Sequence, residues 1–211
     1  MTSTNRNVFD GRFVPALVNT VCAGRTFSDR RRRVVPRAEG VVVEAGFGSG
    51  LNLAYYDPAK VDTLIGVDPD EAMLRLSEAR QSAVDFDLQV IKAGAEAMPI
   101  ETGVADTVVV AYSLCTIPEP ERALAEFRRV LKPSGRLLFV EHGRVDKSWC
   151  GWFQDTINRP WGRIAGGCNL NRCPAHMIKE AGFALSNLRA ERFPAYMFQF
   201  GMHWTGDAKP I

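Results

Sequence analysis

The chain lacks a long hydrophobic run. None of its 211 residues falls in a stretch approaching the ~20 apolar residues that a membrane span needs. The most apolar early segment, residues 13–23, contains Pro15, Asn19 and Thr20, and it lacks the basic-then-apolar order of a signal peptide. We therefore expect a cytoplasmic protein with no membrane partner.

A strong net charge is also missing. The sequence has 26 Lys and Arg against 24 Asp and Glu, a net charge of +2, which argues against nucleic acid as a partner. The basic run at residues 30–33 has no aromatic residues interleaved with it. We interpret this run as a solvated helix end or loop.

Cysteine and histidine are few and scattered. Five cysteines give an odd count, which favours reduced thiols over a disulfide framework. Cys150, Cys168, Cys173 and His176 are the only close grouping, but their spacing is not a standard zinc pattern and no second close cysteine pair exists. The sequence predicts no metal site.

The clearest motif is VVVEAGFGSGLN at residues 41–52. An apolar strand runs into Gly46, Gly48 and Gly50, and residues 51–56 then look helical. This is the pattern of the first β-loop-α unit of a doubly wound sheet. A second strand over residues 62–68 ends in Asp68, which either binds both hydroxyls of a ribose or caps the following helix.

The loop spacing distinguishes between two kinds of nucleotide. A dinucleotide fingerprint needs G-x-G-x-x-G, whereas this loop reads G-x-G-x-G and follows the acidic residue Glu44. A carboxylate is a poor neighbour for phosphate and a good one for an ammonium group. The combination resembles the first motif of class I S-adenosylmethionine methyltransferases; a dinucleotide is the alternative.

The rest of the chain continues the alternation. The patterns predict helices over residues 70–83 and 119–131, strands over 87–93, 104–112 and 136–142, and a terminal antiparallel hairpin from 184–189 and 196–204. Together they predict an α/β fold with a doubly wound, seven-stranded, mostly parallel sheet. We expect one domain over 1–211: a helical cap (1–40, interrupted near Pro15), a cofactor-binding half (41–142), and substrate-side helices with the hairpin (143–211).

Four segments carry a wider resemblance. EAGFGSG, GVDPD, AGAEAMP and RRVLKPSGRLLFVEH, between residues 41 and 142, resemble class I methyltransferases of the type that includes the ubiquinone and menaquinone enzymes. The next segment resembles the pattern EH…W…Q…P.W…..GC.L.R of the methyltransferase-like alkyl thiol S-methyltransferases. Asn171 stands where that group has threonine and Phe47 where it has cysteine. We expect no counterpart of the amino-terminal membrane anchor of the animal members.

The resemblance implies S-adenosylmethionine as cofactor and a set of residues that bind it. Glu44 would orient the ammonium group, Asp68 would bind the ribose, and Glu96 would accept from the adenine amine unless it is a solvated loop acid. Tyr112 and Ser113 would lie near the sulfonium. The full predicted set is Glu44, Gly46, Phe47, Gly48, Gly50, Asn52, Asp68, Pro69, Met73, Ala95, Glu96, Tyr112 and Ser113.

The acceptor is predicted from chemistry. Obvious bases are scarce, because the chain has only three histidines. His142 is the catalytic candidate or a structural histidine, His176 looks structural, and His203 is placed near the pocket. A thiol needs little base catalysis, so this scarcity favours an easily ionised acceptor, and the resemblance implies a small hydrophobic thiol, a natural product or xenobiotic. O-, N- or C-methylation of an aromatic or quinol, and an inactive cofactor-binding regulator, remain alternatives.

Aromatic residues after the fifth strand are expected to contact the acceptor. The tryptophan-rich segment 149–161 has helical spacing and forms either a pocket lid or an ordinary core-facing helix. Arg144, Gln154, Asn158 and Arg159 would supply orienting polar groups. The predicted substrate-side residues are Phe9, Phe13, Cys115, Arg144, Trp149, Trp152, Phe153 and His203. We expect a monomer or weak homodimer.

Overall fold

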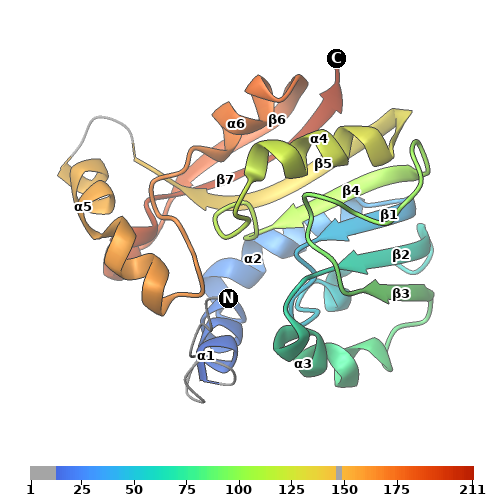
Figure 1. The fold of residues 1–211 in the computed structure, drawn as a ribbon, viewed down its shortest axis with the longest axis horizontal. Helices are drawn as coiled ribbons and strands as arrows, with labels where there is room; N and C mark the ends of the chain where they lie inside the picture. The colour runs from blue at the N-terminus through green and yellow to red at the C-terminus, as the bar shows by residue number, and fades with distance from the viewer. Residues whose placement is uncertain (1–12, 146–148) are drawn as a thin grey trace, which may run out of the picture.

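The computed structural model describes residues 13–145 and 149–211 and is built around one seven-stranded sheet (Figure 1). The strand order is β3-β2-β1-β4-β5-β7-β6. β7 pairs antiparallel with β5 and β6, whereas the other neighbours pair in parallel. The predicted fold class is confirmed. The strands are β1 (Gly40–Ala45), β2 (Val61–Val67), β3 (Asp87–Ile91), β4 (Ala105–Ala111), β5 (Leu131–Gly143), β6 (Phe183–Arg192) and β7 (Met202–Pro210).

The central strands are buried on both faces. Val43 and Val108 belong to one core cluster, and their neighbours Val42 and Val109 belong to another. This alternation follows from the two-residue period of a strand, and apolar residues at every position are what a parallel sheet covered on both sides requires.

Helices cover both faces. Figure 1 shows α4 and α6 in front of the sheet and α2 behind it. The α-helices are α1 (Phe13–Cys22), α2 (Arg25–Val34), α3 (Glu71–Gln81), α4 (Pro120–Val130), α5 (Trp149–Ile164) and α6 (Pro174–Glu180). No described helix combines the length and the hydropathy needed to cross a membrane.

Three local predictions were wrong. The glycine loop opens only a 3-10 turn, Leu53–Tyr55, rather than an α-helix. The last strand is Met202–Pro210, because residues 195–200 form a 3-10 segment and Phe200 packs with Phe193 in an aromatic cluster. Pro15 does not interrupt α1, since it lies in the first turn, where proline is tolerated.

Candidate active site

A cavity of about 690 Å³ opens at the carboxyl ends of the parallel strands. The loops after β1, β2 and β4 meet there, as the strand pattern predicts for this sheet edge. Residues from α1, α2 and the segment after α5 close the other sides. The lining includes most of the predicted cofactor residues, namely Glu44, Gly46, Phe47, Gly48, Asn52, Asp68, Pro69, Met73, Ala95, Glu96, Tyr112 and Ser113.

The glycine loop has the backbone that only glycine adopts easily. Gly46, Gly48 and Gly50 have φ angles of 75°, 55° and 72°. A Cβ on Gly46 would lie 2.1 Å from the Ser113 hydroxyl, so the loop after β1 and the loop after β4 touch at this point. Gly50 lies on the side of the loop away from the cavity, where a Cβ would lie 3.0 Å from Leu53 Cδ1.

Asp68 anchors the glycine loop. Its carboxylate accepts hydrogen bonds from the backbone N–H groups of Gly48 and Asp70, both at 2.8 Å. Burial raises the pKa of Asp68, and the two N–H donors oppose that rise. The cap of α3 is Asp70, which accepts from the N–H groups of Ala72 and Met73. The alternative interpretation of Asp68 as the helix cap is therefore wrong.

Glu44 lies at the inner end of the cavity. Its carboxylate accepts from Asn52 Nδ2 at 2.9 Å and from the Tyr56 hydroxyl at 2.6 Å. Burial raises the pKa of Glu44 to about 7, against the effect of those hydrogen bonds and of the positive charge on Arg31. With a pKa near 7, this carboxyl is close to the midpoint between its protonated and ionised forms at neutral pH.

Arg31 corrects the interpretation of the basic run. Its neighbours Arg30 and Arg33 pair with Glu191, but Arg31 itself is only 4% exposed and lines the cavity. The guanidinium carbon lies 4.9 Å from the centre of the Tyr112 ring, and Nη1 donates to a backbone carbonyl of α1 at 2.6 Å. The missed signal was the spacing of the buried residues of α2, which are Phe27, Arg31 and Val34.

Tyr112 is held rigidly at the cavity wall. Its φ of 58° is unusual for a bulky residue, and its hydroxyl lies 3.0 Å from His203 Nδ1. His203 stacks on Phe193 with ring centres 3.5 Å apart, and burial lowers the pKa of His203 to about 3. His203 is therefore a neutral support for Tyr112, and it does not itself line the cavity.

The other predicted substrate residues lie elsewhere. Among the described residues, the lining omits Cys115, Arg144, Trp149, Trp152, Phe153 and the predicted catalytic residue His142.

The last residues of the tryptophan stripe, Ile157 and Trp161, pack against the aromatic cluster that contains Phe200, as the core-facing alternative predicts. Trp149 and Trp152, at the start of the helix, are 69% and 68% exposed. α5 buries Cys150, Gly151 and Gln154. Arg144 pairs with Asp155 at 2.8 Å. Phe9 and the side chain of Phe13 lie outside the described residues.

His142 and Cys115 lie behind the cavity wall. Both are buried, and His142 Nε2 is 3.2 Å from Cys168 Sγ. The wall in front of them includes Thr116, Gly166 and Gly167, which the sequence did not single out.

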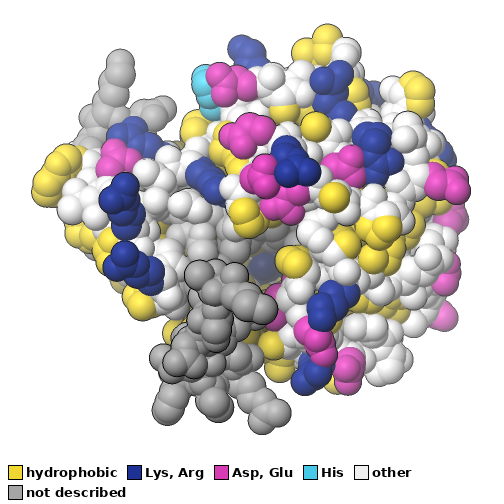
Figure 2. Space-filling model, in the orientation of Figure 1, with side chains coloured by type: hydrophobic (Ala, Val, Ile, Leu, Met, Phe, Trp, Pro, Cys, Tyr) yellow, Lys and Arg dark blue, Asp and Glu magenta, His cyan; other side chains and the backbone are white. Residues whose placement is uncertain are grey.

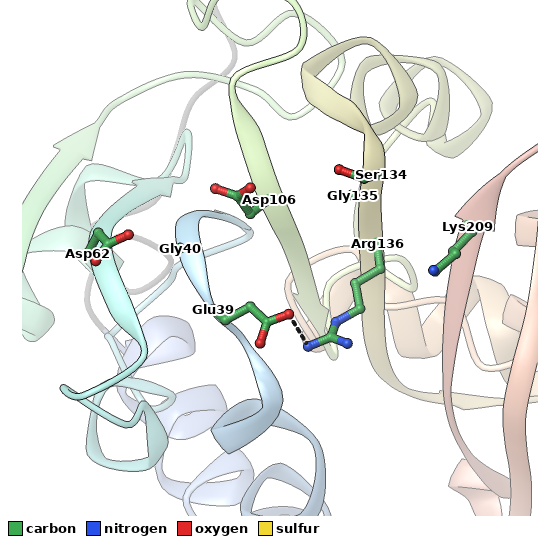
Figure 3. Close-up of a pocket in the computed structure, with 8 residues that line it drawn as sticks. All are labelled: Glu39, Gly40, Asp62, Asp106, Ser134, Gly135, Arg136 and Lys209. Carbon is green, nitrogen blue, oxygen red and sulfur yellow. Dashed lines mark hydrogen bonds and ion pairs between the residues drawn. The ribbon is translucent and has the colours of Figure 1, made fainter.

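A second, polar pocket lies at the opposite edge of the sheet. It measures about 510 Å³, and Figure 3 shows the charged side chains that face it, including the Glu39–Arg136 ion pair at 2.9 Å. This is the amino-terminal end of the parallel strands, where ligands of such sheets do not usually bind. On the face of the molecule that Figure 2 draws, acidic and basic side chains are interspersed.

Comparisons with known proteins agree with this geometry. Residues 43–139 match the family described as a methyltransferase domain. The chain is 31% identical to human thiol S-methyltransferase TMT1A over 80% of its own length and 70% of that protein. It is 27% identical to human thiol S-methyltransferase TMT1B over 90% of its length and 82% of that protein.

Solved structures share the fold at low identity. A Thermotoga maritima S-adenosylmethionine-dependent methyltransferase, described as a possible histamine N-methyltransferase, aligns with a TM-score of 0.68 at 20% identity, covering 95% of this chain and 97% of that one. A geranyl diphosphate methyltransferase in complex with S-adenosylmethionine aligns with a TM-score of 0.65 at 12% identity, covering 99% and 93%.

Proposed function

Because this chain belongs to the S-adenosylmethionine-dependent methyltransferases, we propose that it methylates the thiol sulfur of a small apolar molecule. The observation that carries the proposal is the chemistry of the cavity wall. Among the described residues that line it there is no histidine and no lysine. The human relatives named thiol S-methyltransferases support the same acceptor.

The residues of the cavity fit the cofactor. The glycine loop is a cradle that a Cβ would obstruct, since one on Gly48 would lie 3.3 Å from Met73 Cε. The Asp68 carboxylate suits a pair of ribose hydroxyls. Glu44 and Arg31 bring opposite charges to the same cavity, which matches the ammonium and carboxylate of an amino acid. When bound, the cofactor supplies an electrophilic methyl group on a sulfonium sulfur.

The chain's own contribution is positioning and exclusion of water. The Ser113 N–H donates to Glu141 Oε1 at 2.8 Å, and its hydroxyl donates to the Gly46 carbonyl at 3.3 Å. These bonds fix the loop after β4 against the glycine loop. Arg31 and His203 hold Tyr112 from two sides. We propose that Tyr112 and Ser113 orient the acceptor in this way.

The energetics of deprotonation favour a thiol. An ordinary thiol has a pKa of about 8.5, so forming the thiolate at pH 7 costs about 2 kcal/mol. A phenol with a pKa of about 10 costs about 4 kcal/mol and needs a positioned base. The described wall has no histidine or lysine, and its buried carboxylates Glu44 and Asp68 already accept hydrogen bonds from the protein, so it suits the thiol better.

A matched acceptor panel tests the proposal. The purified protein would be incubated with deuteromethyl-labelled S-adenosylmethionine and pairs that differ in one atom, thiophenol with phenol and an alkyl thiol with its alcohol. We expect labelled thioether by mass spectrometry and a kcat/KM that rises with pH until the thiol is ionised. Faster turnover of a phenol, a quinol or an amine would overturn the thiol proposal in favour of O-, N- or C-methylation. Cofactor binding without turnover on any acceptor would support an inactive regulator.

A further inference from the structure

Three soft metal-ligand side chains converge behind the cavity wall. Cys115 follows β4, His142 lies near the end of β5, and Cys168 follows α5. Their Sγ and imidazole nitrogen atoms all lie within 4.8 Å of one another, and within the described ranges no other group of three such residues comes together. Cys115 and His142 are buried, and Cys168 is partly buried.

The separations are close to those of a tetrahedral zinc site. With Zn–S near 2.3 Å and Zn–N near 2.0–2.1 Å, tetrahedral ligands lie about 3.8 Å apart for two sulfurs and about 3.5 Å for sulfur and nitrogen. His142 Nε2 and Cys168 Sγ are already 3.2 Å apart. The separations from Cys115 Sγ are at most 4.8 Å, so side-chain shifts of about 1 Å would bring all three ligands to tetrahedral distances.

The segments that carry the cysteines are tied together. Both the backbone N–H and the side-chain Nδ2 of Asn169 donate to the Cys115 carbonyl, at 2.8 and 2.9 Å. Arg172 donates to the carbonyls of Leu114 and Ile117 on either side. The edge of the His142 ring packs against Phe200, with ring centres 5.5 Å apart. The ligands are thus held near one another before any ion binds.

Charge balance also suits the location. A divalent cation that binds the three side chains displaces both thiol protons, so two thiolates and a neutral imidazole surround it and the complex has no net charge. A neutral complex avoids the cost of burying an isolated charge. No carboxylate belongs to the group, which favours a borderline-soft cation over Mg²⁺ or Ca²⁺.

We propose that Cys115 Sγ, His142 Nε2 and Cys168 Sγ bind Zn²⁺, with water or another small ligand in the fourth position. The ion would lie behind Thr116 and Gly167, which line the cavity and are adjacent in sequence to two of the ligands. It would support that wall from behind, since none of the three ligands lines the cavity itself. The proposal holds for any methyl acceptor.

Metal content and cobalt spectroscopy on the full chain test the proposal. The protein would be purified under reducing conditions without added chelator, and zinc would be measured by mass spectrometry. We expect about one equivalent. Replacement by Co²⁺ should give a sulfur-to-cobalt charge-transfer band in the near ultraviolet and the visible bands of a tetrahedral ion.

Variants identify the ligands. Cys168→Ser and Cys115→Ser should lose the metal and the cobalt bands, whereas Cys173→Ser should keep both, because Cys173 caps α6 outside the group. Circular dichroism and S-adenosylhomocysteine binding would show that each variant is folded, and the partly exposed Cys168 is the safer of the two ligand substitutions.

Three results would overturn the assignment. The first is a metal-free protein with no cobalt charge-transfer band, in which all five cysteines react with a thiol reagent after denaturation; the group would then be hydrogen-bonded thiols. The second is reaction of only three of the five cysteines with the thiol reagent, which would show that the other two are joined in a disulfide. The third is full metal content in a folded Cys168→Ser variant, which would place the ion elsewhere.

Discussion

Replacement of Asp68 by alanine tests whether its carboxylate binds the cofactor or only stabilises the glycine loop. In the free protein the carboxylate holds the glycine loop through the N–H of Gly48 and also binds the N–H of Asp70. We propose that it binds the cofactor ribose as well. Asp68→Ala removes a charged acceptor from all of these groups at once, but the N–H groups it leaves lie beside an open cavity, where water reaches them.

The expected loss is in affinity more than in stability. Hydrogen bonds to a charged group contribute about 1.5–3 kcal/mol, which corresponds to roughly 10- to 150-fold weaker binding. Isothermal titration with S-adenosylhomocysteine measures this directly. Asp70→Ala is the comparison variant, because Asp70 lines the same cavity but caps α3 instead of binding the glycine loop. Loss of a cap costs about 1 kcal/mol, or roughly 2–4 °C in melting temperature for a chain of this size, with a smaller effect on binding.

Two outcomes would refute the reasoning. Binding of S-adenosylhomocysteine by Asp68→Ala within threefold of the wild type would show that the carboxylate does not contact the ligand. Equal loss of affinity in Asp70→Ala would show that the effect is shared by both carboxylates at the start of α3 and is not specific to Asp68.

Four further predictions follow from buried groups. The folded protein keeps a proton on Glu44 up to about pH 7, which the unfolded chain releases near 4.5. Its unfolding free energy in urea should therefore fall by roughly 3 kcal/mol between about pH 5 and pH 8, and Glu44→Gln should show a smaller fall; equal falls would contradict the raised pKa. Arg31→Gln should weaken S-adenosylhomocysteine binding at least tenfold, whereas Arg32→Gln, which changes an exposed side chain of the same run, should not. Equal effects would show that the basic run attracts the ligand only through its overall charge. Gly48→Val should abolish binding in titration, because a β-branched residue does not adopt the φ of 55° found there, but it should leave the circular dichroism spectrum unchanged. Normal binding would show that the ligand lies elsewhere. Gln154→Leu should lower the unfolding free energy in urea by roughly 2–5 kcal/mol, since the buried amide bonds three backbone groups, and a change below about 0.5 kcal/mol would contradict this role.

The sheet and its functional edge were predictable because their signals are local. A run of consecutive apolar residues identifies a strand buried on both faces, and each of β1, β2 and β4 contains such a run, at residues 41–43, 64–67 and 108–111. Pro69 and Asp70 fix the start of α3 within a residue or two. Since the carboxyl ends of parallel strands share one edge, the glycine loop, Asp68 and Ser113 were placed together without any knowledge of contacts between them.

The segments that failed depend on partners far away in the chain. The tryptophan stripe of α5 has helical spacing, but spacing does not determine which face meets the core, and α5 buries Gln154 because its amide reaches backbone groups of other segments. Residues 195–200 have the composition of a strand. They leave the sheet because Phe200 packs against Phe27 from α2, with ring centres 5.7 Å apart.

The group of Cys115, His142 and Cys168 could not be recognised in the sequence for a different reason. Zinc patterns are recognisable when paired ligands lie on one short loop, a few residues apart. Here the ligands are separated by 27 residues (142 less 115) and 26 residues (168 less 142): Cys115 follows β4, His142 lies near the end of β5, and Cys168 follows α5. The topology that brings the cofactor residues to one edge also brings these three together. A search that orders residues by the strand end at which they lie, rather than by spacing, would pair Cys115 with His142, since Cys115 follows β4 and His142 lies near the end of the neighbouring parallel strand β5. It would still miss Cys168, whose position depends on how the segment after α5 returns to the sheet.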